Sequence, residues 1–327
     1  MIGLTLQFSI GVLLLSKAAD WFARAVAGIA RETHMPRYAV GAVLVGFVTN
    51  VSALTVSVTA ALSGKPGLSL GNAVGSIIFD TGLTLGLCLW LTRVPVQTPW
   101  LRDHGFPMIL AGIAFYFFTV ITDLTRFTAL LLLILLALYL AWSLAASRRE
   151  PELAREAEEL AAAALQHAPG ARHRWAALVL LVSVSLPILV LSGQWVLSSA
   201  IEMARSLGVS DAVIGLTLLA TGTSIPTLVA ALAASRQGHL DTAVGMILGA
   251  NIYTLLGVIG VSALAKPLPV TAANRLFDFP VMLLLLIIPL FPLMVGRQPG
   301  RLTGGLLLLV FAAYEYSLFV LRGVFDP

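Results

Sequence analysis

Apolar runs of about twenty residues recur along the whole sequence, and they constrain the fold more than any other feature. A helix of this length crosses the roughly 30 Å hydrocarbon core of a bilayer. With 58% hydrophobic and 11% charged residues, the 327-residue chain has more apolar surface than one soluble core could bury. We therefore expect an all-α integral membrane protein with about ten transmembrane helices. The expected spans are 4–27, 39–62, 68–91, 106–121, 127–144, 175–198, 213–234, 242–264, 279–295 and 302–321.

Basic residues are divided unequally between the connections on the two sides of these spans. Twelve Lys and Arg lie on the side reached after the odd-numbered spans, against six on the other side. Because cytoplasmic loops carry the excess of basic residues, the first side is expected to be cytoplasmic. We therefore expect a multi-pass protein of the inner (plasma) membrane with both termini outside. The charged segment 147–174 would be a cytoplasmic linker.

The two halves of the chain align with each other at a fixed offset of 174 residues. Identical residues coincide at Arg31/Arg205, Gly41/Gly215, Thr49/Thr223, Gly71/Gly245, Gly75/Gly249 and Gly86/Gly260. Because each half has five expected spans, an odd number, the second copy must enter the membrane upside down. Inverted repeats of this kind are typical of alternating-access secondary transporters. We expect two inverted five-helix repeats, residues 1–146 and 175–327, joined by the linker 147–174.

Polar and helix-breaking residues interrupt two spans of each half. The stretch "ATGTSIPT" (220–227) reads like a turn inside a span, and "GFVTNVSA" (46–53) is its counterpart. The next span of each half contributes "GNAVGSIIFD" (71–80) and "GMILGANIYT" (245–254). A break at membrane depth is tolerated only beside a cavity or packed protein, and its free carbonyls and hydroxyls are good ligands for hard cations. Close packing of small residues is the alternative, but it does not explain the carboxylate of Asp80.

These motifs resemble those of the calcium/cation antiporter superfamily, which includes the sodium/calcium exchangers. The superfamily's repeats carry a pattern close to G-T-S-hydrophobic-P-E in the second span and G-N-x-x-G-S-N-x-F-(N/D) in the third. The resemblance covers nearly the whole chain. It implies a ten-helix fold in which spans two, three, seven and eight line a cation site at mid-membrane, with exchange by alternating access.

Carried over position by position, the ligands of the superfamily fall on a depleted set in this chain. Ala53 and Thr227 stand where the two motif glutamates are expected. The cation-binding side chains that the resemblance implies are Thr49, Asn50, Asn72, Ser76, Asp80, Thr223, Ser224, Thr227, Asn251 and Thr254, with backbone carbonyls from Gly46 and Ala220. Asp80 is the expected principal charged ligand.

Two hypotheses of function follow from this depleted set. The first is a secondary active cation antiporter. A buried divalent ion needs compensating fixed charge, and Asp80 alone neutralises one positive charge, so we expect transport of Na⁺ or H⁺, or weak handling of Ca²⁺. The second hypothesis is a transport-incompetent relative that serves as a membrane scaffold or sensor, because both glutamates are missing.

Other classes of function are not favoured by the sequence. No catalytic triad, Cys/His pair or zinc-ligand pattern lies on an expected soluble face, so we predict no enzyme, no resident cofactor and no nucleic-acid partner. The expected partners are the lipid bilayer and inorganic cations. Cys88, the single cysteine, is interpreted as a small buried hydrophobe. Glu315 within the last span is interpreted as a protonated packing or dimer-contact residue, with a proton relay as the alternative.

Overall fold

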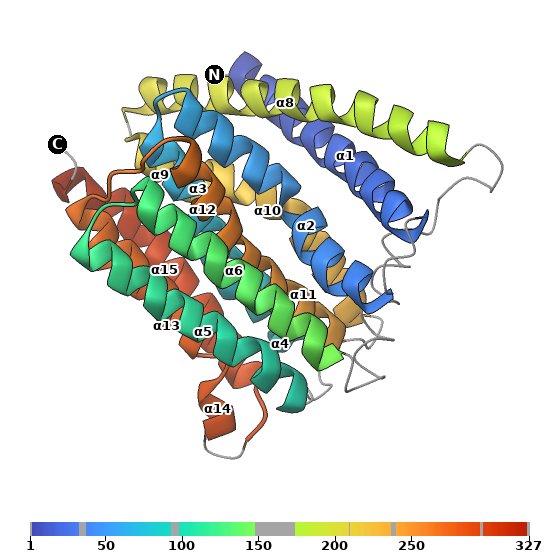
Figure 1. The fold of residues 1–327 in the computed structure, drawn as a ribbon. Helices are drawn as coiled ribbons and strands as arrows, with labels where there is room; N and C mark the ends of the chain where they lie inside the picture. The colour runs from blue at the N-terminus through green and yellow to red at the C-terminus, as the bar shows by residue number, and fades with distance from the viewer. Residues whose placement is uncertain are drawn as a thin grey trace.

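The computed structural model describes residues 2–32, 37–92, 98–147, 174–208, 210–236, 240–294 and 297–325, and these are almost entirely helical (Figure 1). Its first half contains α1 (Ile2–Glu32), α2 (Arg37–Leu62), α3 (Pro66–Phe79), the π-helical turn η1 (Asp80–Leu85), α4 (Gly86–Leu91), α5 (Thr98–Ile121) and α6 (Arg126–Ser147). Its second half contains α8 (Arg174–Leu207), α9 (Asp211–Ile214), η2 (Gly215–Leu219), α10 (Ala220–Arg236), α11 (Leu240–Ile252), η3 (Tyr253–Val258), α12 (Ile259–Ala265), η4 (Asn274–Asp278), α13 (Phe279–Ile287), α14 (Phe291–Met294) and α15 (Arg301–Phe325).

The helices follow the apolar runs of the sequence. Every expected span except 279–295 lies inside one continuous helical stretch. Five helices in the described part of the chain are long and apolar enough to cross a bilayer: Pro66–Leu91, Arg126–Ser143, Leu180–Met203, Asp211–Arg236 and Ala243–Ala265. The run 279–295 is interrupted by a turn between α13 and α14. Pro289 and Pro292 explain this interruption, because proline lacks the N–H that would continue a helix.

The outside of the bundle is apolar, as a lipid-facing surface requires. Leu13, Leu110 and Phe127 are among the large apolar side chains that are more than half exposed on three different helices. A soluble protein rarely exposes so much contiguous apolar surface. The fold is therefore that of a multi-pass helical membrane protein.

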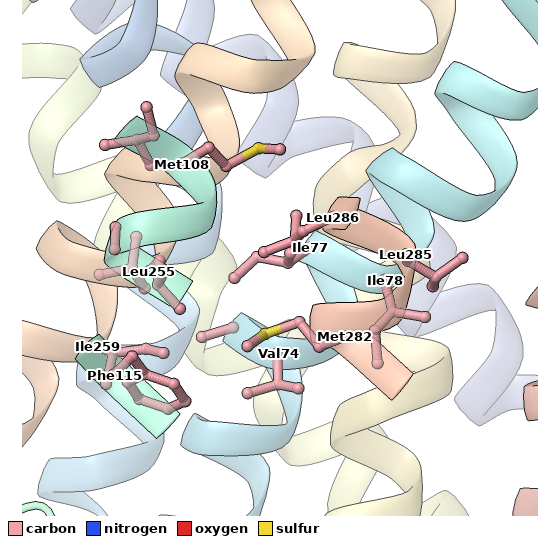
Figure 2. Packing of buried hydrophobic residues seen from close by; sticks show 14 of the residues in the cluster. Val74, Ile77, Ile78, Met108, Phe115, Leu255, Ile259, Met282, Leu285 and Leu286 are labelled. Atoms are coloured by element: carbon pink, nitrogen blue, oxygen red, sulfur yellow. The ribbon is translucent and has the colours of Figure 1, made fainter. Parts of the chain in front are cut away.

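Two apolar clusters hold the helices together. In the larger cluster, Val74, Ile77 and Ile78 of α3 lie beside Met282 and neighbouring leucines of α13 (Figure 2). Phe115 of α5 packs edge to face on Phe279, with ring centroids 5.0 Å apart. The smaller cluster joins α1, α2 and α8, and Figure 1 shows α1 and α8 side by side at one edge of the bundle. The larger cluster also includes Ala231 of α10, so α3 packs against α10 as well as against α13.

Two glycines bring α3 into direct contact with the backbone that leads into α10. A Cβ atom on Gly75 would lie 2.4 Å from the carbonyl oxygen of Leu216, and one on Gly71 would lie 2.8 Å from that of Ala212. Any side chain at Gly75 would therefore push the two helices apart. Close packing of small residues and a polar site are therefore not exclusive alternatives here. The glycines hold the polar face of α3 against α10.

The break expected within 220–227 is not a turn, and this expectation was wrong. α10 runs without interruption from Ala220 to Arg236 with Pro226 inside it, and the irregularity is the π-helical turn η2 just before it. Pro226 removes one helical hydrogen bond, the one to the carbonyl of Gly222, and α10 continues past it. The hydroxyl of Thr223 can donate to the carbonyl of Leu219 at 3.0 Å or of Ala220 at 3.2 Å, which helps to satisfy the backbone there.

Candidate functional site

Asp80 is a carboxylate buried in the middle of the bundle. It lies where α3 passes into η1 and is only 3% exposed. The hydroxyl of Ser224 on α10 is its hydrogen-bond partner. Oδ1 of the same carboxyl is buried without a hydrogen-bond partner. An unpaired carboxylate oxygen in a dry interior costs several kcal/mol in ordinary circumstances, so it marks a place that is suited to a bound cation or proton.

A hydrogen-bonded network beside Asp80 ties α2, α3 and α10 together. Nδ2 of Asn72 donates to Oγ of Ser57 at 2.9 Å and to the carbonyl of Ala53 at 3.2 Å. Oδ1 of Asn72 accepts from the hydroxyl of Thr223 at 3.1 Å. The hydroxyls of Ser76 and Thr223 lie 3.3 Å apart. Both ends of the Asn72 amide are therefore used within the protein, and its role in this conformation is to fix the three helices.

The contact between α2 and η3 corresponds in position to the contact between Ser224 and Asp80. The hydroxyl of Thr254 donates to Oδ1 of Asn50 at 2.5 Å, and Nδ2 of Asn50 donates to the carbonyl of Ala250 at 3.1 Å. The same 174-residue offset separates position 50 from 224 and position 80 from 254. Both regions change to a π-helical turn at this point, η1 at Asp80 and η3 one residue before Thr254. Such turns are frequent at functional sites.

Asn251 completes the polar centre on the side of α11. Its Nδ2 donates to the hydroxyl of Thr81 on η1 at 2.7 Å, and the sulfur of Met108 lies 3.9 Å away. Its Oδ1 is buried and has no hydrogen-bond partner. Asn251 therefore reaches η1 at the residue next to Asp80 and leaves a second oxygen available.

The structure thus gathers most of the ligands implied by the sequence around η1. Ser76, Asp80, Thr223 and Ser224 meet between α3 and α10, while Asn50 and Thr254 meet between α2 and η3. Thr227 is buried on α10, one turn beyond Thr223.

The predicted backbone ligands and Thr49 do not belong to either of these two groups. The carbonyl of Ala220 lies 3.2 Å from the Thr223 hydroxyl, whose single proton can also go to Oδ1 of Asn72 or to the carbonyl of Leu219. Gly46 and Thr49 belong to the part of α2 whose side chains lie outside the described residues. Ser57 and Thr81 were not predicted, although both are hydroxyl residues within apolar spans.

A second buried carboxylate, Asp278, was also missed. Its Oδ2 accepts from Nδ2 of Asn274 at 2.8 Å, and its Oδ1 accepts from the Tyr314 hydroxyl at 2.9 Å. Unlike Asp80, it has a protein donor on each oxygen, so it anchors α15 to η4. The available signal was a carboxylate inside "LFDFPVM", directly before the span expected at 279–295. Glu315, next to Tyr314, is partly buried.

The charge at the centre is low. Among the described residues, no three His, Cys, Asp or Glu side chains come together as a metal site. The described ion pairs are peripheral: Lys65 bonds Asp211 and Arg275 bonds Asp123, each at 2.8 Å and partly exposed. The centre therefore consists of one carboxylate surrounded by hydroxyls, amides and carbonyls.

Comparison with known proteins matches nearly the whole chain to membrane exchangers. The family model described as "Sodium/calcium exchanger protein" matches residues 3–145 and 177–320. CaxA of Alkalimonas amylolytica, a candidate antiporter by name, is 32% identical over 326 residues, covering 98% of this chain and 99% of CaxA. The sodium/calcium exchanger MaX1 of Methanosarcina acetivorans is 26% identical, covering 95% of this chain and 97% of MaX1. A solved structure of the sodium–calcium exchanger NCX_Mj, soaked with 2.5 mM Na⁺ and 0.1 mM Ca²⁺, matches with a TM-score of 0.64 at 25% identity, covering 98% of this chain and 99% of that chain.

Proposed function

We propose that this chain, which belongs to the sodium/calcium exchanger family, exchanges cations across a membrane at a site built around Asp80. One observation carries the proposal: Oδ1 of Asp80 is buried, has no hydrogen-bond partner and lies between α3 and α10. A carboxylate left open in this way is stable only when a positive charge or a proton joins it. The hydroxyl of Ser224 lies at the same place and would complete the ligand shell.

Two inverted repeats and alternating access are part of this proposal. The family model matches the chain in two stretches, 3–145 and 177–320, close to the two expected halves. Contacts at positions 50/254 and 224/80 also correspond at the 174-residue offset. Two related halves around one central site can rock against each other and open it to either side. In the same proposal ten spans cross the membrane, both termini face outward, and the linker 147–174, which lies outside the described residues, is cytoplasmic.

The charge at the site supports a monovalent ion as substrate. Ala53 and Thr227, which stand at the motif-glutamate positions, are buried and uncharged. Asp80 can balance one positive charge, and hydroxyl or carbonyl dipoles only replace the dipoles of a hydration shell. A divalent ion would keep an uncompensated charge in the interior, which is strongly unfavourable. We therefore assign Na⁺ or H⁺ as the carried ion, with Ca²⁺ bound weakly.

A scaffold or sensor without transport is the second candidate, and one observation favours it. Asn72, Thr223, Asn50 and Thr254 all bond to one another or to backbone within the protein. These bonds hold the central helices together without any ion. A relative that had lost transport would retain these internal bonds and could lose the two glutamates.

An ion panel in proteoliposomes separates the two candidates. The purified protein is reconstituted, gradients of Na⁺, K⁺, H⁺, Ca²⁺ and Mg²⁺ are imposed in turn, and flux is compared with that of protein-free vesicles. We expect saturable Na⁺ or H⁺ flux that the other monovalent ion inhibits and Ca²⁺ inhibits weakly. Absence of flux under every gradient favours the scaffold. Tight, saturable Ca²⁺ exchange overturns the argument from charge.

A further inference from the structure

A row of polar side chains follows one face of α3, η1 and α4 at a spacing of four residues. Its members are Asn72, Ser76, Asp80, Thr84, Cys88 and Thr92. In a regular α-helix every fourth residue is displaced by about 40° around the axis, so a row this long would turn away from its neighbour. A π-helical turn closes i→i+5 rings and displaces the row in the opposite sense. The position of η1 in the middle of the row therefore keeps both of its ends on α10.

Hydroxyl groups of α10 pair with this row on both sides of its centre. Thr223 contacts the first two members and Ser224 contacts Asp80. Ser235, near the end of α10, forms a hydrogen bond with the hydroxyl of Thr92 and is also the partner of the Cys88 thiol. Because later residues of one helix pair with later residues of the other, α3–α4 and α10 run in the same direction and reach the same membrane face.

Thr84 is the member of the row that the protein leaves unpaired. It is fully buried, and its Oγ1 has no hydrogen-bond partner. The pairs on either side, Asp80 with Ser224 and Cys88 with Ser235, place Thr84 against the middle of α10, between these two serines. Two consecutive turns of the same helix therefore carry buried oxygens without partners, Oδ1 of Asp80 and Oγ1 of Thr84. Burying such groups is unfavourable unless a ligand or water uses them.

The corresponding positions in the second half of the chain lack this continuity. Val258 stands 174 residues after Thr84 and interrupts the polar spacing between Thr254 and Ser262. A cavity of about 160 Å³ beside it is lined mainly by apolar side chains, including those of Leu54 and Val258. The continuous polar row is therefore specific to the contact between α3–α4 and α10. If membrane spans in general needed such polar residues, the second half would carry the same row.

We propose that this row is the path along which a monovalent cation moves between Asp80 and the membrane face where α4 and α10 end, with the Thr84 hydroxyl as an intermediate ligand. The inference rests on the proposed function. An uncharged hydroxyl suits this step, because a transit site must replace part of the hydration shell and still release the ion. Thr227, which is buried on α10 between Ser224 and Ser235, would supply a second hydroxyl.

The first experiment removes the hydroxyl of Thr84 and keeps its shape. Thr84→Val should lower Na⁺ flux by roughly tenfold or more, the factor expected when one polar contact to a charge is lost. The Na⁺-dependent rise in Tm should stay unchanged, because Asp80 is intact. Thr84→Ser should restore flux. Ser69→Ala, which removes another buried and unpaired hydroxyl on α3 outside the row, should leave flux within about twofold. Full flux in Thr84→Val overturns the proposal.

The second experiment does not require transport, so it separates failure of this inference from failure of the proposed function. Cys88 is the only cysteine of the chain, and a small cationic methanethiosulfonate reagent should modify it from the face where α4 ends. As a control, Cys88→Ala combined with Leu89→Cys moves the thiol to a neighbouring buried position that lies against Gly304 of α15. We expect modification of Cys88 and protection of the control thiol. Equal protection of both thiols contradicts the path, whether or not the protein carries ions.

Discussion

Replacing Asp80 with asparagine tests whether this carboxylate is the charge that binds the cation. The two side chains have nearly the same size, so the substitution leaves the packing of α3 against α10 intact. The amide can still pair with the Ser224 hydroxyl. What changes is the fixed negative charge beside the unpartnered Oδ1 position. The variant therefore isolates electrostatics from packing.

The expected loss of affinity is large. At a separation of about 4 Å and an effective dielectric constant of about 20, two unit charges attract by about 4 kcal/mol. This corresponds to about a thousandfold in the dissociation constant. The variant should nevertheless fold, because removal of an unpaired buried charge lowers the desolvation cost of the native state. Its Tm without Na⁺ should be equal to or above that of the unmodified protein.

Thermal unfolding in detergent with a Na⁺ titration measures both effects. For the unmodified protein, Na⁺ at about a hundred times its dissociation constant should stabilise the folded state by about 2.7 kcal/mol. Asp80→Asn should abolish this rise in Tm and the flux in proteoliposomes. Asp278→Asn is the matched control, because it alters a buried carboxyl whose oxygens both have protein donors. It should lower Tm and keep the response to Na⁺. A normal Na⁺ response in Asp80→Asn would remove Asp80 from the mechanism.

Three further predictions follow from the centre of the protein. Ala53→Glu combined with Thr227→Glu should strengthen Ca²⁺ binding in calorimetry, because two carboxylates neutralise a divalent ion. Thr254→Val should lower the free energy of unfolding by about 1–3 kcal/mol, since it removes the buried hydrogen bond from this hydroxyl to Oδ1 of Asn50. Gly75→Ala should lower it by about 1–3 kcal/mol or more, because its Cβ would lie 2.4 Å from a backbone oxygen of η2; an unchanged Tm in either variant contradicts the packing described.

The positions of the helices could be predicted because the bilayer fixes their length. A run of about twenty apolar residues has one favourable arrangement in hydrocarbon, and the sequence contains these runs, although helices such as α5 and α8 extend beyond the expected ends. The expectation of one span over 279–295 was wrong, because Pro289 and Pro292 affect the backbone more than the hydropathy of the run does. The expectation of a polar break at 220–227 was wrong for a related reason. Pro226 removes a single donor, which α10 tolerates, and the π-helical turn η2 ends seven residues before it.

The sequence identified several residues of the site, but it did not show which of them contact each other. Asp80 stood out because a carboxylate within an apolar span is rare. Its partner could not be derived, because the rotation of η1 decides which helix Asp80 faces, and the sequence does not reveal a π-helical turn. Asp278 was missed, because it directly precedes an expected span and its partner is distant in the sequence. In the structure it accepts from Tyr314, 36 residues further along the chain.

The two corresponding contacts at the centre, Asn50 with Thr254 and Asp80 with Ser224, differ in how an ion can act on them. A ligand shifts a conformational equilibrium only as far as it binds the two states differently. The contact between Asn50 and Thr254 is already satisfied, since the hydroxyl donates to the amide oxygen and the amide donates to a carbonyl. The contact between Asp80 and Ser224 keeps an open oxygen. A cation therefore adds binding energy on the side of α3 and α10, and we expect ion-dependent movement to begin at this contact.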